Sequence, residues 1–326
     1  MKGYKHNTNR KPPGPLPLFP VPYPGESFYS VLCRYHVRSG NINDWHTSNQ
    51  LFGYNSSLTS TLLTPFHLEM VKRWLSPSSG INSEKMLRSN TAFNLYAITS
   101  ISRELERIRD VIDGRKATAS FPRWMHPRII HPSGYLRFCP ECAAAQRKLY
   151  GEPYWQVLPQ IEEVEYCPRH KARIRDSHIQ LESIGFHYHP ASSVLTEGYP
   201  GTVGKNRCQR WEPLYKKEKP FFIKLAENID WLLQNGEPYA GYERLCRVYN
   251  RLSGKDVYHG WFEIRKQRLW EAFSGISRSD QLYSYLEYKN PRQVGGTSLY
   301  LYSVRVCSHV MIMTALFGDP KTFYEH

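Results

Sequence analysis

Four potential metal ligands occur as two short pairs near the middle of the chain. Cys139-x-x-Cys142 is the first pair and Cys167-x-x-His170 is the second. Thiolates and imidazole are preferred zinc ligands, and a Cys-x-x-Cys turn directs both sulfur atoms at one ion. The spacing therefore predicts a tetrahedral Cys3His site that holds a structural Zn²⁺. Because four protein ligands fill the coordination sphere, no position is left for a catalytic water.

Other uses of these cysteines are weaker interpretations. A redox Cys-x-x-Cys is expected as a lone pair in a βαβ context, whereas here a second pair follows. A disulfide needs an oxidising compartment, and the N-terminal sequence contains no apolar segment of a secretory signal. Whether a second metal binds near His187, His189 and Cys208 stays open, since a His-x-His strand often occurs without a metal.

The sequence contains no recognisable pattern of an enzyme active site. It lacks a Walker loop, a GxSxG elbow and an HExxH helix. Glu162, Glu163 and Glu165 form an acidic run, which we interpret as a solvated face rather than as a group of catalytic carboxylates. We therefore expect a protein that is not an enzyme.

A surplus of positive charge indicates a polyanionic partner. The 326 residues include 43 Lys and Arg against 29 Asp and Glu, which gives a formal net charge of +14. Nucleic acid is a natural partner for such a surplus. We expect contacts with double-stranded DNA from two basic windows, at about 115–128 and 205–224, and from a predicted C-terminal helix-turn-helix. The candidate residues are Arg115, Lys116, Arg123, Arg128, Lys205, Arg207, Arg210, Lys216, Lys217, Arg265 and Arg268.

The composition is that of a soluble globular protein. Hydrophobic residues make up 40% of the chain and charged residues 22%. No apolar run approaches the roughly 18–20 residues of a membrane-spanning helix. We expect a protein of the cytoplasm without a membrane partner.

The N-terminal third predicts an arm followed by short helices. Residues 1–25 are rich in proline, glycine and basic side chains, so they predict an extended arm. Residues 26–114 predict a helical, helix-turn-helix-like domain, because apolar residues recur at helical spacing. Thr64 and Pro65 are expected to cap and begin one of these helices. The predicted helices cover 26–39, 44–51, 64–75 and 95–114.

The remaining sequence predicts two further domains. Residues 115–200 predict a zinc-ribbon domain, with candidate strands at 153–161 and 164–167. Residues 201–326 predict a basic C-terminal helical domain with helix-turn-helix proportions. Its predicted helices cover 242–253, 261–275, 279–288 and 303–318. The expected fold is therefore mainly α with a small zinc-ribbon β module.

Two segments carry a combination of motifs that is specific to one family. FPVPYPGESFYSVLCRYHVRSGN has the order P-x-P-x-E-x-x-x-S-x-x-x-R, and LRFCPECAAAQRKLYGEPYWQVLPQIEEVEYCPRH has R-x-C-P-x-C, Y-G-E-x-Y-W and C-x-x-H. The sequence resembles the TniQ/TnsD family of transposon target-selection proteins over about residues 19–175. The matching residues are Pro22, Pro24, Glu26, Ser30, Arg34, Arg137, Cys139, Pro140, Cys142, Tyr150, Gly151, Glu152, Tyr154, Trp155, Cys167 and His170.

The resemblance implies a bacterial protein, associated with the nucleoid, that helps to choose the insertion site of a Tn-type transposon. Proteins of this family bind a DNA site directly or join an RNA-guided CRISPR Cascade complex, and they then recruit the AAA+ regulator TnsC. The arm and first helix are the expected contact with that regulator, through Tyr23, Glu26, Phe28, Arg34 and Arg38. TnsD-like proteins typically run longer, so both a compact protein and part of a longer one fit the sequence.

Two other functions stay open. A zinc-ribbon transcription factor that takes no part in transposition would share the basic charge and the metal ligands. A metal-dependent nuclease would require an open carboxylate site, which we do not find in the sequence.

Overall fold

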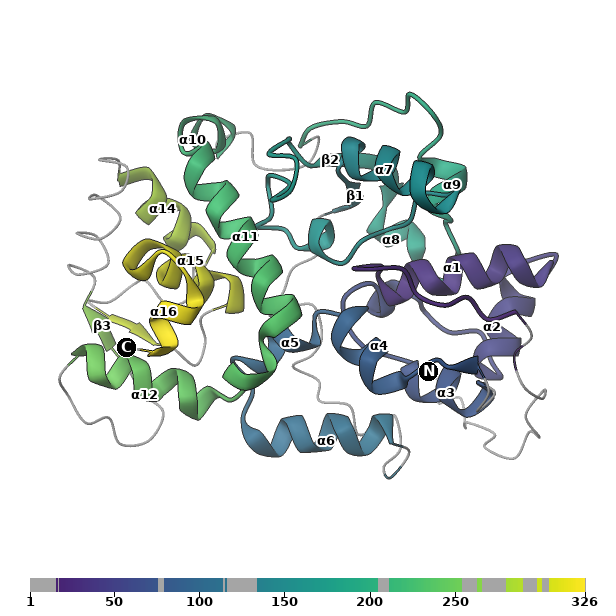
Figure 1. The fold of residues 1–326 in the computed structure, drawn as a ribbon, viewed down its shortest axis with the longest axis horizontal. Helices are drawn as coiled ribbons and strands as arrows, with labels where there is room; N and C mark the ends of the chain where they lie inside the picture. The colour runs from purple at the N-terminus through teal and green to yellow at the C-terminus, as the bar shows by residue number, and fades with distance from the viewer. Residues whose placement is uncertain are drawn as a thin grey trace, which may run out of the picture.

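Helices dominate the part of the chain that the computed structural model describes, which is residues 16, 18–75, 79–113, 115, 134–204, 211–253, 263–265, 280–289, 298–300 and 305–325. Two small antiparallel sheets accompany the helices in this part (Figure 1). This mainly helical fold, with a small sheet beside the four metal-ligand residues, confirms the predicted fold class. Across the described ranges, no helix has the length and apolar character needed to span a membrane.

The N-terminal helices are short and capped by their own sequence. Ser27 Oγ accepts a hydrogen bond from Ser30 N at 3.2 Å to begin α1, and Gly40 ends it with φ +65°. Asn43 caps α2 in the same way, so both helices begin and end close to the predicted positions. The elements of this part are α1 (Phe28–Ser39), α2 (Asp44–Phe52), η1 (Thr59–Leu62), α3 (Leu68–Trp74), α4 (Ser83–Ser89), α5 (Phe93–Ala97) and α6 (Ser102–Ile112).

The predicted helix start at Thr64 and Pro65 is wrong. Thr64 Oγ1 donates a hydrogen bond back to Ser60 O at 2.6 Å, so the hydroxyl is used by the preceding 3-10 turn instead of capping a helix. The chain turns through His67 at φ +70°, and α3 begins after it.

The single helix predicted over 95–114 is two helices. Thr99 and Ser100 both direct their hydroxyls to Tyr96 O, at 3.3 and 2.9 Å, and thereby close a turn after α5. Glu104 then accepts a hydrogen bond from Ile101 N at 3.3 Å to begin α6. Side-chain bonds to the backbone thus break a segment whose apolar periodicity is continuous.

The middle part holds one two-stranded sheet, and its two strands flank the ligand pairs in the sequence. β1 (Tyr135–Phe138) precedes Cys139 and pairs antiparallel with β2 (Arg175–Gln180), which follows His170. The strands predicted over 153–161 and 164–167 are wrong, because this backbone forms η5 (Leu158–Gln160) and isolated bridges. The helices of this part are α7 (Pro140–Tyr150), α8 (Leu181–Ile184) and α9 (Ala191–Val194).

A long helix crosses from the middle part to the C-terminal part. This helix, α11, contacts α4 and α5 on one side and α15 on the other (Figure 1). α15 is buried along nearly its whole length and ends at Gly318, as predicted. The elements of this part are α10 (Glu212–Lys217), α11 (Lys219–Asn235), η7 (Glu237–Tyr239), α12 (Tyr242–Ser253), β3 (Glu263–Arg265), α14 (Asp280–Lys289), β4 (Ser298–Tyr300), α15 (Val306–Phe317) and α16 (Pro320–Glu325).

The helix predicted over 261–275 is contradicted where it is described. Residues 263–265 form β3, which pairs antiparallel with β4, with Ile264 opposite Leu299. Backbone pairing with a partner 35 positions away therefore decides the conformation of this segment. Arg265 lies on this strand rather than on a recognition helix, and Arg268 lies outside the described residues.

One hydrophobic core extends through the described residues from α1 to α16. Its largest buried side chains come from all parts of the chain, for example Tyr29, Trp155, Phe222 and Phe323. The domain boundaries at 26, 115 and 201 stay a prediction.

Candidate metal centre and the contact between the two motifs

The four predicted metal ligands meet at one point. The two sulfur atoms of Cys142 and Cys167 lie 3.7 Å apart. Nδ1 of His170 lies 3.5, 3.3 and 3.5 Å from the sulfur atoms of Cys139, Cys142 and Cys167. All four ligand atoms are within 4.8 Å of one another.

These distances fit a tetrahedral zinc ion. Zn–S bonds near 2.3 Å and Zn–N bonds near 2.0–2.1 Å place two sulfurs about 3.8 Å apart and a sulfur about 3.5 Å from a nitrogen. Hydrogen bonds from the thiols of Cys139 and Cys142 hold the pKa of the Cys167 thiol below its usual range, in the direction of the thiolate that a metal needs. The cluster can hold a metal ion, with four protein ligands and no open position.

The fold positions the first ligand pair at a junction of strand and helix. β1 leads into Cys139, which occupies the N-cap of α7, and Pro140 takes the first helical position. Cys142 follows in the first turn of α7. Since the N-terminus of a helix favours negative charge, this placement suits two thiolates. The second pair lies in a turn in which Lys171 N donates to Cys167 O at 2.8 Å.

A buried arginine two residues before Cys139 organises the loop between the pairs. Arg137 has no exposed surface. Its guanidinium donates to Ile161 O at 2.8 Å and to Val164 O at 2.6 Å, while Gln160 Oε1 accepts from its backbone N at 3.0 Å. These bonds fix the loop that leads to Cys167, and they replace the strand pairing that the sequence predicted.

The sequence predicted that the acidic run, Glu162, Glu163 and Glu165, forms a solvated face. The structure contradicts this prediction. Glu163 and Glu165 are each 1% exposed, whereas Glu162 is half-buried. Glu165 lies 2.5 Å from Arg173 and 3.8 Å from Arg137, so it is neutralised by two guanidinium groups. The expectation is wrong because Glu163 and Glu165 are buried by the fold, and Arg137 and Arg173 supply the charge partners of Glu165.

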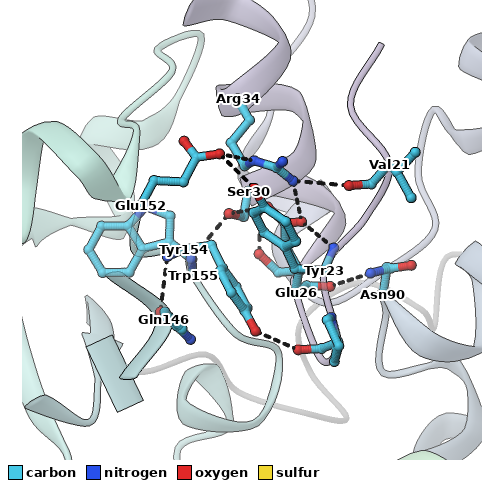
Figure 2. A network of polar contacts seen from close by, with 12 residues as sticks. Val21, Tyr23, Glu26, Ser30, Arg34, Asn90, Gln146, Glu152, Tyr154 and Trp155 are labelled. Carbon is cyan, nitrogen blue, oxygen red and sulfur yellow. Dashed lines mark hydrogen bonds and ion pairs between the residues drawn. The ribbon is translucent and has the colours of Figure 1, made fainter. Parts of the chain in front are cut away.

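The two family motifs meet in a network of ion pairs (Figure 2). Arg34 of α1 donates to Glu26 Oε2 at 2.8 Å and to Glu152 Oε1 at 2.9 Å. Glu26 is fully buried and Arg34 is 5% exposed. Arg38 also reaches Glu152 Oε1, at 3.2 Å. The first helix is therefore joined to the metal-bearing part by side chains 118 positions apart.

Hydrogen bonds to the backbone extend this contact. Ser30 Oγ donates to Glu26 Oε1 at 2.9 Å and accepts from Trp155 N at 3.1 Å. Tyr154 OH donates to Pro24 O at 2.9 Å (Figure 2). The Tyr23 ring stacks on Tyr150 and lies 3.6 Å from the Arg34 guanidinium carbon. The spacing of both motifs therefore has a structural cause.

Burial changes the protonation of the central carboxyl. Removal from water raises the pKa of Glu26 to about 7, although Arg34 and three hydrogen-bond donors favour the charged form. Burial likewise raises the pKa of Tyr23 above its usual value, with Arg34 acting in the opposite direction.

Three of the five predicted regulator contacts are internal in this structure. Glu26 and Phe28 have no exposed surface and Arg34 has very little, so these side chains hold the fold together and offer little to a partner. Tyr23 is half-buried and Arg38 is 41% exposed. The described part of the predicted arm also packs on the fold, since Leu16 is buried and its N donates to Trp74 O at 2.8 Å.

The predicted DNA contacts are described only in part. Lys216 and Lys217 are exposed at the end of α10, and Arg115 is exposed but paired with Asp110 at 2.9 Å. Arg265 lies on β3. The other candidates, Lys116, Arg123, Arg128, Lys205, Arg207, Arg210 and Arg268, lie outside the described residues.

The second metal site stays untested. Cys208 lies outside the described residues, and the rings of His187 and His189 are 6.2 Å apart. His187 Nδ1 lies 2.7 Å from Asp44 Oδ2, so this histidine bridges the loop after α8 to α2. This role of Asp44 could not be predicted from the sequence, because nothing near Asp44 indicates a partner 143 positions away.

Comparison with known proteins agrees with these two motifs. Residues 17–174 match the family model described as TniQ. The transposition protein TnsD of transposon Tn7 from Escherichia coli is 29% identical over 157 residues. Residues 17–174 form a TniQ domain. The TniQ match spans α1 to the second ligand pair, and thus includes the whole network of Figure 2. The aligned part is 48% of this chain and 31% of its relative's length.

Proposed function

We propose that this protein selects the target site of a Tn-type transposon by connecting target DNA to the AAA+ regulator TnsC. The observation that carries the proposal is the TniQ domain over residues 17–174, in which both motifs are joined through Glu26, Arg34 and Glu152. Its relative TnsD is named a transposition protein. The proposed role is binding and recruitment, without catalysis.

The target is reached by direct contact with duplex DNA or through an RNA-guided Cascade complex. The net charge of +14 and the exposed Lys216 and Lys217 support direct contact, because lysines attract phosphate without needing a particular base sequence. The Cys3His cluster would hold a structural Zn²⁺ and stabilise the segment between β1 and β2 when loaded.

A pull-down tests this role. The purified protein is immobilised and offered the AAA+ regulator encoded beside its gene, with and without candidate target DNA. We expect the regulator to be retained, and more strongly with DNA present. Arg38→Glu should weaken retention, because Arg38 is the exposed member of the predicted contact. Lys72→Glu, the same charge change on α3, is the matched control.

The outcomes separate the candidate functions. Retention of DNA without the regulator would support a transcription factor instead. Retention of neither would overturn the proposal.

A further inference from the structure

We propose that five lysines on neighbouring surfaces bind the phosphate backbone of duplex DNA. They extend from the second ligand pair to α10 and α11, and we name them the lysine strip: Lys171, Lys216, Lys217, Lys219 and Lys224. This inference rests on the proposed function, in which DNA is a partner. The basic window predicted over 205–224 already contains Lys216, Lys217, Lys219 and Lys224. Lys171 becomes their neighbour only through the fold.

Lys171 is presented by the turn that contains the second ligand pair. Its backbone takes the left-handed conformation, with φ +56°, which is uncommon for a residue other than glycine. Its N donates to Cys167 O at 2.8 Å, so the same turn directs the ligands inward and Lys171 outward. The side chain is 46% exposed.

A shared carboxylate connects this turn to α11. Glu227 pairs with Lys171 through one oxygen, and Lys224 Nζ lies 3.8 Å from the other. The two ammonium groups therefore lie on either side of one carboxylate, and together they keep a net positive charge. Lys224 is 49% exposed, so it is accessible from the same side as Lys171.

An aromatic side chain connects the turn to α10 and the start of α11. Tyr166, which precedes the ligand Cys167, donates from its hydroxyl to Tyr215 O of α10 at 3.0 Å. Lys219 Nζ lies 5.5 Å from the centre of the Tyr166 ring. Lys216 and Lys217 continue the strip on α10, where Lys217 is 55% exposed.

Acidic side chains near the strip do not cancel its charge towards solvent. Glu218 is 9% exposed, and Asp319 accepts two hydrogen bonds from Thr322 within its own turn. Glu227 and Glu212 are half-exposed acids, but Glu227 already contacts two lysines and Glu212 pairs with Arg173 at 2.7 Å. A row of ammonium groups recognises phosphate by charge alone, so we expect contact with the DNA backbone and little dependence on base sequence.

A salt series of DNA binding tests the strip. The test protein carries Lys171→Gly, Lys219→Gln and Lys224→Gln, in which glycine suits the left-handed backbone and so removes the charge without straining the turn. The matched control carries Lys85→Gln, Lys148→Gln and Lys321→Gln, three exposed lysines on α4, α7 and α16. Binding of a short duplex of arbitrary sequence is followed by fluorescence anisotropy.

We expect the plot of log affinity against log salt to be shallower by about 3 for the test protein, since each phosphate contact adds about 1 to the slope. Affinity at low salt should fall about tenfold or more, while the control keeps the wild-type slope and affinity. Equal metal content in all three proteins shows that the ligand turn is intact.

Two results would overturn the inference in different ways. If the test protein keeps the slope and affinity of the wild type, the strip is not the DNA surface, and the proposed function stands. If the wild type itself does not bind duplex DNA, both the strip and direct target binding fail. Retention of the regulator in the pull-down would then leave the route through a Cascade complex.

Discussion

Glu26 and Arg34 form a buried ion pair at the junction of the two TniQ motifs. Neither side chain is appreciably exposed. A buried ion pair adds little stability compared with apolar groups of the same size, but losing one partner leaves an uncompensated charge. These motif residues are therefore essential for the fold whether or not a partner ever touches them.

Removing the arginine should have a large effect. We expect Arg34→Ala to lower the free energy of unfolding by about 3–5 kcal/mol, because both Glu26 and Glu152 lose a partner. Chemical denaturation measures the change. Arg38→Ala is the control, since Arg38 is 41% exposed and its pair with Glu152 is worth less than about 1 kcal/mol. Equal losses in the two variants would contradict the buried role.

The raised pKa of Glu26 makes a prediction about pH. The folded value of about 7 lies above the ordinary 4.5, so the folded state binds more protons than the unfolded state between these values. The stability that Glu26 contributes is therefore fully present below pH 4.5 and is lost as the pH rises through 7. Between pH 4.5 and 7, the free energy of unfolding of the wild type should fall by about 3 kcal/mol relative to that of Glu26→Gln.

Comparison of two variants isolates this effect from other groups. Buried His67, whose pKa burial lowers to about 4, contributes a change of the opposite sign, but equally in both proteins. Glu182→Gln, at an exposed position on α8, should show the same pH dependence as the wild type. A difference between wild type and Glu26→Gln that does not vary with pH would refute the prediction.

The metal ligands make a prediction about composition. The purified protein should contain one zinc ion per chain by elemental analysis, and Cys139→Ser should lower that content and destabilise the segment from β1 to β2. Cys246→Ser, at a half-buried thiol of α12, should keep the metal. Wild-type protein without zinc would disprove the site.

At the scale of elements, helix ends could be predicted from the sequence where a capping side chain or a glycine at that position fixes them. Gly40 and Gly318 end α1 and α15 where the predicted helices end, and Asn43 caps α2 directly before its predicted start. The four metal ligands were equally predictable, because the two-residue spacing within each pair is enough to direct both ligand atoms at one ion.

Elements that depend on distant partners were not predictable. The backbone of 160–165 bonds to Arg137, and Glu165 is buried by Arg137 and Arg173. Residues 263–265 pair with β4 in a sheet, although their apolar periodicity is that of a helix. Nothing in the nearby sequence distinguishes these segments from a ribbon strand, a solvated face or a helix, because the deciding group lies far along the chain.

The end of α11 offers a steric test of its contact with α5. A Cβ at Gly236 would lie 2.4 Å from Leu232 O and 2.9 Å from Asn94 O, both of them backbone atoms. Gly236→Ala should therefore destabilise the protein by about 1–3 kcal/mol through overpacking, measured by denaturation. Gly134→Ala, where a Cβ meets nothing within 4 Å, should have little effect. An unchanged Gly236→Ala protein would show that α11 can move away from α5.

At the scale of the whole molecule, the N-terminal segment divides into two parts. Residues 18–25 pack against α1 and α7 through Tyr23 and Pro24, so deleting residues 1–25 should lower stability as well as regulator binding. The composition of residues 1–15 predicts an extended segment with little to bury, so deleting them should leave the unfolding transition unchanged. Denaturation and the pull-down, applied to both truncations, separate folding from recruitment. Equal stability of the two truncated proteins would contradict this division.

The pairing of Arg34 with Glu152 also sets an order of events during synthesis. The two residues are 118 positions apart, and a ribosome adds about 5–20 residues each second. Arg34 is therefore made roughly 6–24 s before the carboxylate that it will contact. For that interval the first helix has neither Glu152 nor Trp155 to close over it. During this interval the face of α1 that will contact Glu152 and Trp155 is uncovered, and the nascent chain must avoid aggregation through it until both residues have left the ribosome.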